Sequence, residues 1–115
     1  MTTGIGYRLL LVAQDQFPEP FLTYGPIAWV ELGRRLGKGL LVATPLRLIY
    51  VSEATFDPIA MPHAETVGVH LKTGLLGATL TVAVEAGPPL ISLYGRKALV
   101  HGTWAFLDET LKQRR

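Results

Sequence analysis

Apolar residues in this chain fall into short runs that glycine and proline separate at short intervals, a pattern typical of many short strands. Two segments, residues 66–72 (TVGVHLK) and 78–85 (ATLTVAVE), alternate apolar and polar positions with a period of two. This alternation predicts strands with one buried and one exposed face. Two further short strands are expected near residues 59–61 and over residues 90–95.

The most informative stretch is residues 37–52 (GKGLLVATPLRLIYVS), which is apolar almost throughout but has Pro45 at its centre. A single long strand would lose a ladder hydrogen bond at a central proline. We therefore predict two strands, GLLVAT and RLIYVS, joined by a type I turn. In that turn Thr44 hydrogen-bonds its own backbone and Pro45 supplies a φ of about −65°.

One segment of the N-terminal third fits two kinds of secondary structure. Residues 5–16 (IGYRLLLVAQDQ) fit either one face of a short helix or a buried strand. The prolines of residues 17–20 (FPEP) end either element, because each fixes φ and biases its predecessor to extended geometry. Residues 20–32 predict a strand interrupted near Gly25-Pro26, at a bulge or an edge position. Residues 33–39 (GRRLGKG) are expected to form the first loop.

The period changes after residue 96. Val100, Trp104, Leu107 and Leu111 are spaced at i, i+4, i+7 and i+11, which predicts one apolar helical stripe. We expect this helix to start near Lys97. The whole chain is then one mainly β domain, residues 1–115, with about seven antiparallel strands in a bent sheet or partly open barrel. Trp104 and Leu107 of the helix are expected to plug one open end.

Composition limits the class of protein. The chain has 115 residues, of which 49% are hydrophobic and 17% charged, and this excludes a disordered chain. The apolar run of residues 9–13 is too short for a membrane span of about 20 residues or for a secretory signal, so we expect a soluble, cytoplasmic protein. The net charge of +2 does not indicate a nucleic-acid partner.

The absence of cysteine excludes disulfides, thiolate nucleophiles and cysteine zinc sites. Asparagine is absent too, and together with eight prolines this composition is typical of a thermostable protein. Biased codon usage would produce the same composition.

The segment from Gly39 to Val51 combines a glycine, an apolar strand, a threonine, a turn, arginine, leucine and a second apolar strand. In this it resembles PH-like domains, in particular the small bacterial pleckstrin-homology-like domains and the related GRAM domains. Residues 59–82 are similar to the family's strand, corner, strand, glycine-rich turn and strand, and the C-terminal helix with its tryptophan also fits. The resemblance covers residues 20–112. Pro45-Leu46 departs from the polar turn of most relatives, and the proline-rich strand at 18–26 is a second departure.

The resemblance implies one candidate binding site. In PH domains that bind phosphoinositides, basic residues of the first hairpin loop hold the phosphates, and the matching positions here are Arg34, Arg35 and Lys38. Arginine forks suit phosphate oxygens. The alternative is a solvated loop that protects a sheet edge from aggregation. Arg47 follows the hairpin turn, and we assign it a structural role, paired with a carboxylate or capping carbonyls, rather than a ligand-binding one.

Motifs for catalysis or metal binding are not evident. His63, His70 and His101 have no ligand spacing, and the H-x-E of residues 63–65 lacks the cysteine partner of zinc deaminases. Gly4-Ile5-Gly6 lacks the rest of a dinucleotide fingerprint. We expect His70 to face outward, and we expect no enzyme activity, metal or cofactor.

The mean hydropathy of +0.30 is high for a small monomer, which favours apolar surface buried between subunits. We therefore expect a non-catalytic PH-like module for self-assembly or protein interaction, either as a homo-oligomer or with a protein partner. The alternative is a module that binds anionic headgroups at a membrane surface through the first hairpin. A small enzyme without a recognisable motif is the third hypothesis.

Overall fold

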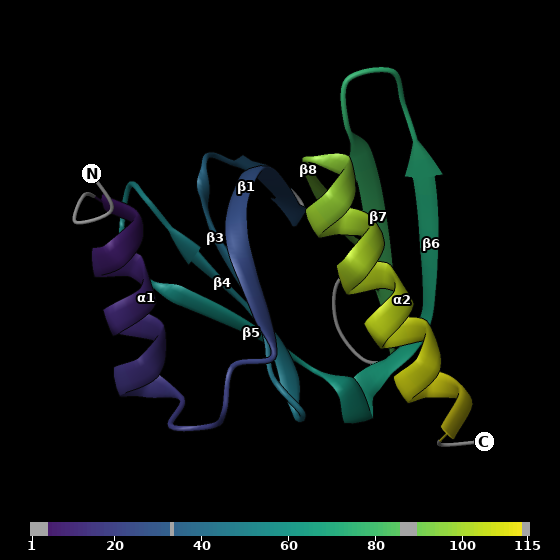
Figure 1. The fold of residues 1–115 in the computed structure, drawn as a ribbon, viewed down its shortest axis with the longest axis horizontal. Coiled ribbons are helices and arrows are strands. Elements are labelled where there is room, and N and C mark those ends of the chain that lie inside the picture. The colour runs from purple at the N-terminus through teal and green to yellow at the C-terminus, as the bar shows by residue number, and fades with distance from the viewer. Residues whose placement is uncertain (1–4, 33, 86–89, 114–115) are drawn as a thin grey trace.

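The computed structural model describes residues 5–32, 34–85 and 90–113, and these form one antiparallel sheet with a helix at each end of the chain (Figure 1). The sheet follows the order β5-β4-β3-β1-β8-β7-β6, and β2 also pairs with β1. The elements are α1 (Ile5–Gln16), β1 (Thr23–Leu32), β2 (Arg34–Leu36), β3 (Gly39–Ala43), β4 (Arg47–Ser52), β5 (Pro58–Pro62), the 3-10 turn η1 (His63–Glu65), β6 (Thr66–Thr73), β7 (Ala78–Val84), β8 (Leu90–Gly95) and α2 (Lys97–Gln113).

The mainly β class, the antiparallel sheet and the C-terminal helix are therefore confirmed, and α2 begins at Lys97 as expected. The sheet is bent, since residues from both of its halves share one core with α2, and it is not closed, because β5 and β6 at its ends do not pair with each other. Neither helix in the described part of the chain has both the length and the apolar character that a membrane crossing requires.

The predicted hairpin of residues 37–52 is confirmed. β3 pairs with β4 in an unbroken register from Gly39 opposite Ser52 to Ala43 opposite Leu48. Thr44 closes the turn: its backbone N–H donates to the Arg47 carbonyl at 3.0 Å, and its hydroxyl accepts the Arg47 N–H at 3.1 Å. Pro45 lies at the apex, where no ladder hydrogen bond is lost.

The sheet has two differently packed faces. The inner face, which packs against α2, contributes Leu41, Tyr50 and Leu80 to a core that also holds Val100 and Leu107 of the helix. The outer face of β3 and β4 contributes a second apolar cluster, which α1 covers with its own buried residues; this cluster comprises Leu9, Ala13, Leu40, Val42, Ile49 and Val51. The open choice at residues 5–16 is thus settled as a helix, because its apolar positions match this outer patch.

β1 is the strand on which both halves of the sheet meet. Its residues 23–27 pair with β3 and its residues 30–32 with β2 along one edge, while β8 pairs along the other edge from Ile27 onward. Pro26 lies before that point, on a locally unpaired edge, and a bulge follows between Ile27 and Trp29. The expected interruption at Gly25-Pro26 is therefore wrong, because β1 continues through both residues and pairs there with β3, while the bulge lies further along the strand.

The expected loop at residues 33–39 is wrong in part. Arg34–Leu36 form β2, which continues the same hairpin register that β3 follows further along β1, with Leu32 opposite Arg34 and Ile27 opposite Gly39. These three residues carry no readable period, so their strand conformation comes from pairing with β1 rather than from local sequence.

Candidate functional site

The three cations that the resemblance singled out lie on the first hairpin. Arg34 and Arg35 belong to β2, and Lys38 lies in the break between β2 and β3; all three are exposed. A hydrogen bond fixes the segment between β2 and β3, because the Tyr50 hydroxyl donates to the Gly37 carbonyl at 2.6 Å. Burial is the main cause that raises the pKa of Tyr50 above its ordinary value of 10.0.

An aromatic stack connects this hairpin to the neighbouring strand β8. The Arg35 guanidinium lies over the Trp29 ring, 4.2 Å from its centroid, and the Trp29 ring stacks on Tyr94 with a centroid distance of 5.4 Å. The cation–π contact fixes the guanidinium on the outer face of the sheet. Its ion pair with Glu31 is long at 3.9 Å and both side chains are more than half exposed, so the pair contributes little.

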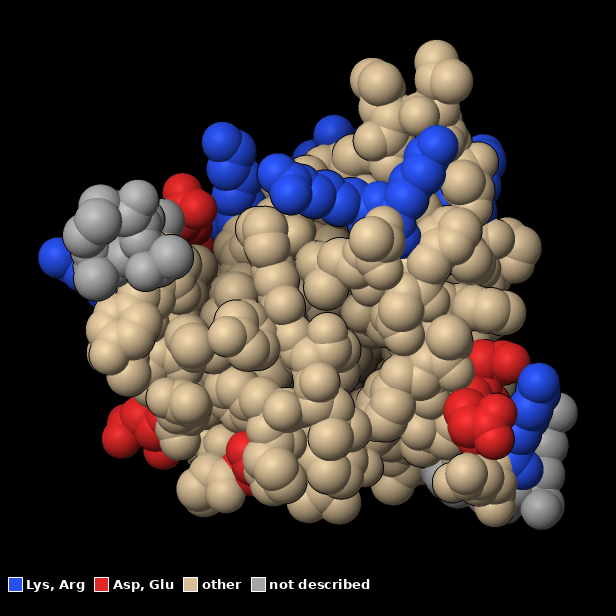
Figure 2. Space-filling view, viewed as in Figure 1, with Lys and Arg blue, Asp and Glu red and all other residues tan. Residues whose placement is uncertain are grey.

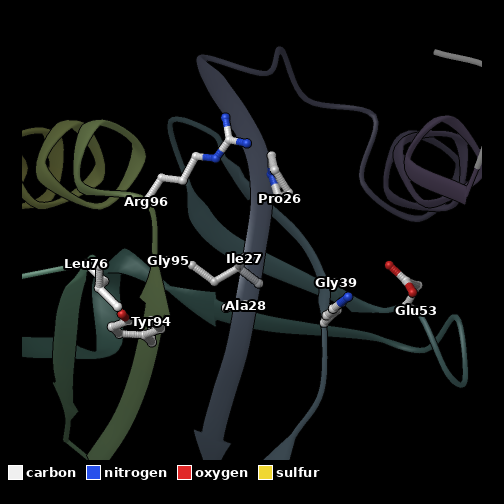
Figure 3. Close-up of a pocket in the computed structure, with 10 residues that line it drawn as sticks. Pro26, Ile27, Ala28, Gly39, Glu53, Leu76, Tyr94, Gly95 and Arg96 are labelled. Carbon is white, nitrogen blue, oxygen red and sulfur yellow. The ribbon is translucent and has the colours of Figure 1, made fainter. Parts of the chain in front are cut away.

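A hollow of about 360 Å³ lies beside the stack (Figure 3). Lys38 and Arg96 line it together, although one follows β2 and the other follows β8. In Figure 3 the Arg96 side chain points toward β1 and Pro26. Glu53 also lines the hollow, on the side of Gly39, and offsets part of this positive charge (Figure 3). Arg96 is distant in sequence from the first hairpin, so its place beside Lys38 could not be predicted from the sequence.

The β6–β7 hairpin ends at the same hollow. Leu76 lines it but remains 89% exposed, and the preceding Leu75 is 91% exposed. The Gly74 N–H donates to the Gly77 carbonyl at 2.8 Å and closes the turn beneath them.

Lysine and arginine side chains gather along one edge of the molecule, just below the projecting turn of the β6–β7 hairpin (Figure 2). Acidic side chains in this view lie mostly at the opposite corners, and the surface between is almost uncharged. Arg34, Lys38 and Arg96 form no ion pair with any described residue. We call Arg34, Arg35, Lys38 and Arg96 the basic rim.

Arg47 takes the structural role that its position predicted. Its guanidinium makes a 2.9 Å ion pair and a 3.2 Å hydrogen bond with the two carboxylate oxygens of Glu19, and it lies over the Phe17 ring. The Thr44 hydroxyl donates to the same carboxylate at 2.7 Å. This network fastens the segment between α1 and β1 to the β3–β4 turn, so Arg47 is not part of a ligand site.

The histidines lie apart from one another. His63 is buried, with its Nε2 2.9 Å from the Thr44 carbonyl oxygen and its ring edge-on to Phe106. His70 is exposed, as expected. His101 contacts the Thr73 hydroxyl at 2.9 Å. Within the described residues no three His, Asp or Glu side chains are grouped closely enough to hold a metal ion.

Comparison with known proteins identifies a shared fold. No family model matches the chain, and no curated protein matches it. Among solved structures it is similar to the crystal structure of the C-terminal domain of an unknown protein from Leishmania infantum, with a TM-score of 0.68 and 18% identity. The match covers 94% of this chain and 99% of that domain. At this identity the match shows the fold alone.

Proposed function

We propose that the protein is a non-catalytic binding module that attaches to anionic membrane surfaces through its basic rim. The observation that carries this proposal is the meeting of Lys38 and Arg96 on one hollow, beside the stacked Arg35, at a single edge of the molecule. Arg35 and Lys38 lie on or next to β2, and Arg96 follows β8. Because β2 and β8 pair with opposite edges of β1, the fold brings these cations together. Headgroup binding through the first hairpin was the alternative function that the sequence suggested, and it is the function that we favour here.

Physical chemistry favours a membrane over a small charged ligand at this rim. The cations are exposed and spread along an edge, an arrangement that suits a plane of headgroup phosphates, and each Lys or Arg near such a surface contributes about 1 kcal/mol. Such binding weakens as salt screens it over about 8–10 Å. Glu53 reduces the net charge of the hollow, which disfavours one tightly held anion there.

A PH-like architecture remains part of the proposal. A bent antiparallel sheet with one C-terminal helix on its inner face supports the resemblance, as does the hairpin around Thr44 and Arg47. β2 and α1 are additional features that the resemblance did not specify. The cytoplasmic location and the thermostability likewise remain predictions.

Sedimentation with vesicles tests the proposal. Equimolar phosphatidylserine–phosphatidylcholine vesicles should bind the protein at low salt, phosphatidylcholine vesicles should not, and salt should weaken binding. The variant Lys38→Gln/Arg96→Gln should bind about 10- to 30-fold more weakly. Arg8→Gln/Lys112→Gln removes the same charge outside the hollow and should change affinity far less. Equal loss in both variants, or no binding by the unmodified chain, contradicts the proposal.

Self-assembly is a second candidate, and an adjoining apolar surface favours it. Tyr7 and Leu11 lie four residues apart on α1 and are 49% and 45% exposed. Tyr24 of β1, 55% exposed, lines a largely apolar hollow of about 460 Å³ against α1. Light scattering should then find a discrete multimer that Tyr7→Ser/Leu11→Ser dissociates and Val67→Ser does not. A monomer at all concentrations removes this candidate.

A further inference from the structure

We infer that the tip of the β6–β7 hairpin is a bilayer-inserting anchor, in which Leu75 and Leu76 enter the lipid while the basic rim stays among the headgroups. This inference rests on the proposed membrane binding and adds the depth and orientation of the bound domain. Leu75 and Leu76 are uncharged, so the proposed electrostatic binding by itself gives them no role.

The exposure of these leucines is unusual for their position. Single exposed apolar residues are ordinary on protein surfaces. Here two consecutive leucines are 91% and 89% exposed and occupy the apex of a two-residue turn, where Gly, Asn, Asp and Ser are the usual residues. Elsewhere in the described chain the large exposed apolar side chains are no more than 57% exposed. The hairpin therefore presents its most apolar residues at its most protruding point (Figure 1).

The base of the hairpin is held firmly, so the leucines are presented rather than folded back. Thr73 pairs with Ala78, and the Gly74 N–H donates to the Gly77 carbonyl. The Tyr94 ring packs so closely on Gly77 that a side chain there would lie 2.8 Å from the ring. Through Tyr94 and Trp29 the tip is connected to Arg35, so the apolar tip and the basic rim keep a fixed relation.

Charge around the tip identifies a membrane as its partner. Leu76 shares its hollow with Lys38 and Arg96, and exposed Lys72 lies two residues before the turn. A convex apolar tip above a row of cations matches acyl chains beneath anionic headgroups. Among the described residues that line this hollow, Glu53 is the one acidic side chain, so the rim as a whole remains positive.

A site-specific label tests insertion directly, because the chain contains no cysteine. Leu75→Cys, labelled with an environment-sensitive fluorophore, should shift its emission to the blue on equimolar phosphatidylserine–phosphatidylcholine vesicles. Lipids brominated on the acyl chain should quench it. Leu46→Cys is the matched control, since it is 56% exposed at the opposite end of β3 from the hollow. That label should neither shift nor be quenched.

Binding of Leu75→Ser/Leu76→Ser separates the tip from the rim. This variant should keep the same fold by circular dichroism, keep its salt-dependent attraction to anionic vesicles, and lose about 10- to 100-fold in affinity at high salt. Vesicle binding without a shift at position 75 overturns the insertion but leaves the proposed function standing. No vesicle binding by the unmodified chain overturns both. A shift at position 75 that appears without vesicles and grows with protein concentration assigns the leucines to a second copy instead and overturns insertion.

Discussion

The outer face of the sheet differs between its two halves. Over β3 and β4 it is apolar and α1 covers it, so that both faces of these strands are buried from Gly39 to Ala43 and from Leu48 to Ser52. Over β7 and β8 the outer face carries Thr, Ser and Tyr side chains, which are only partly buried. Strands buried on both faces read as continuous apolar runs, whereas strands with one solvated face alternate.

The covered half of the sheet contributes mainly to stability, and the open half carries the surfaces that we propose for binding. The covered half holds the second apolar cluster and the Glu19–Arg47 network, which anchor the fold. The open half holds the aromatic stack and the projecting hairpin, which face solvent. Substitutions on the outer face should therefore affect folding in the first half and surface properties in the second.

The largest expected effect comes from truncating the covered outer face. Ile49→Ala removes a fully buried side chain beneath α1 and should lower the free energy of unfolding by about 2–5 kcal/mol. Thr81→Ala, at an outward position of β7, should change it by no more than about 0.5 kcal/mol. Urea denaturation measures both. Similar losses for the two variants would abolish the distinction between the halves.

A smaller loss should follow from Glu19→Ala. Glu19 accepts from Thr44 and pairs with Arg47, and the two side chains are only 16% and 28% exposed. Removing the carboxylate should lower the free energy of unfolding by about 1.5–3 kcal/mol, since it leaves a partly buried guanidinium without its partner. Lys112→Ala breaks an exposed ion pair with Asp108 and should have an effect of about 0.3–0.5 kcal/mol. If both ion-pair variants lose equally, the Glu19 network does not anchor this half.

In the open half, Gly77→Ala should destabilise the hairpin base by about 1–3 kcal/mol. Its Cβ would lie 2.7 Å from the Gly95 carbonyl oxygen and 2.8 Å from the Tyr94 ring. Gly74→Ala is the control, because its nearest atom would be 3.4 Å away. Thermal unfolding distinguishes the two variants. Equal unfolding temperatures for the two variants would show that the Tyr94 ring can move aside and does not support the tip.

The smallest effect concerns Tyr50, on the inner face of the covered half. Tyr50→Phe loses the hydrogen bond to Gly37 and should cost about 1 kcal/mol. Because the pKa of Tyr50 is raised in the folded state, its stabilisation is complete below the unfolded pKa of about 10 and is lost as pH rises toward the folded value. Urea unfolding measured from pH 9 to 11 should show a steeper loss in the unmodified chain than in Tyr50→Phe. Parallel curves would contradict a titrating Tyr50.

Much of the fold could be predicted because its signals are local. The apex at Pro45, the alternation in β6 and β7 and the stripe of α2 each depend on residues close in sequence. Residues 5–16 stayed ambiguous, since adjacent apolar residues fit a helix face and a buried strand equally. β2 was missed because three residues of mixed polarity have no period, and only their register with β1 makes them a strand.

The candidate site was predictable only where it is contiguous. Arg34, Arg35 and Lys38 form a basic cluster in sequence, but Arg96 joins them through the β1–β8 pairing of Ile27 with Gly95. Leu75 and Leu76 lie between two glycines, a pattern that predicts an ordinary turn. Their near-complete exposure is a property of the folded hairpin, and sequence alone does not contain it.

The position of β1 between β3 and β8 also has a consequence for the order of assembly. During synthesis, β1, β3, β4 and β5 leave the ribosome together and pair as nearest neighbours, with α1 available to cover them. β1 cannot gain its second neighbour until β8 emerges, and Val100 and Leu107 follow still later. We therefore expect nascent chains that stop before residue 90 to keep one edge of β1 and the future inner core open, as substrates for chaperones.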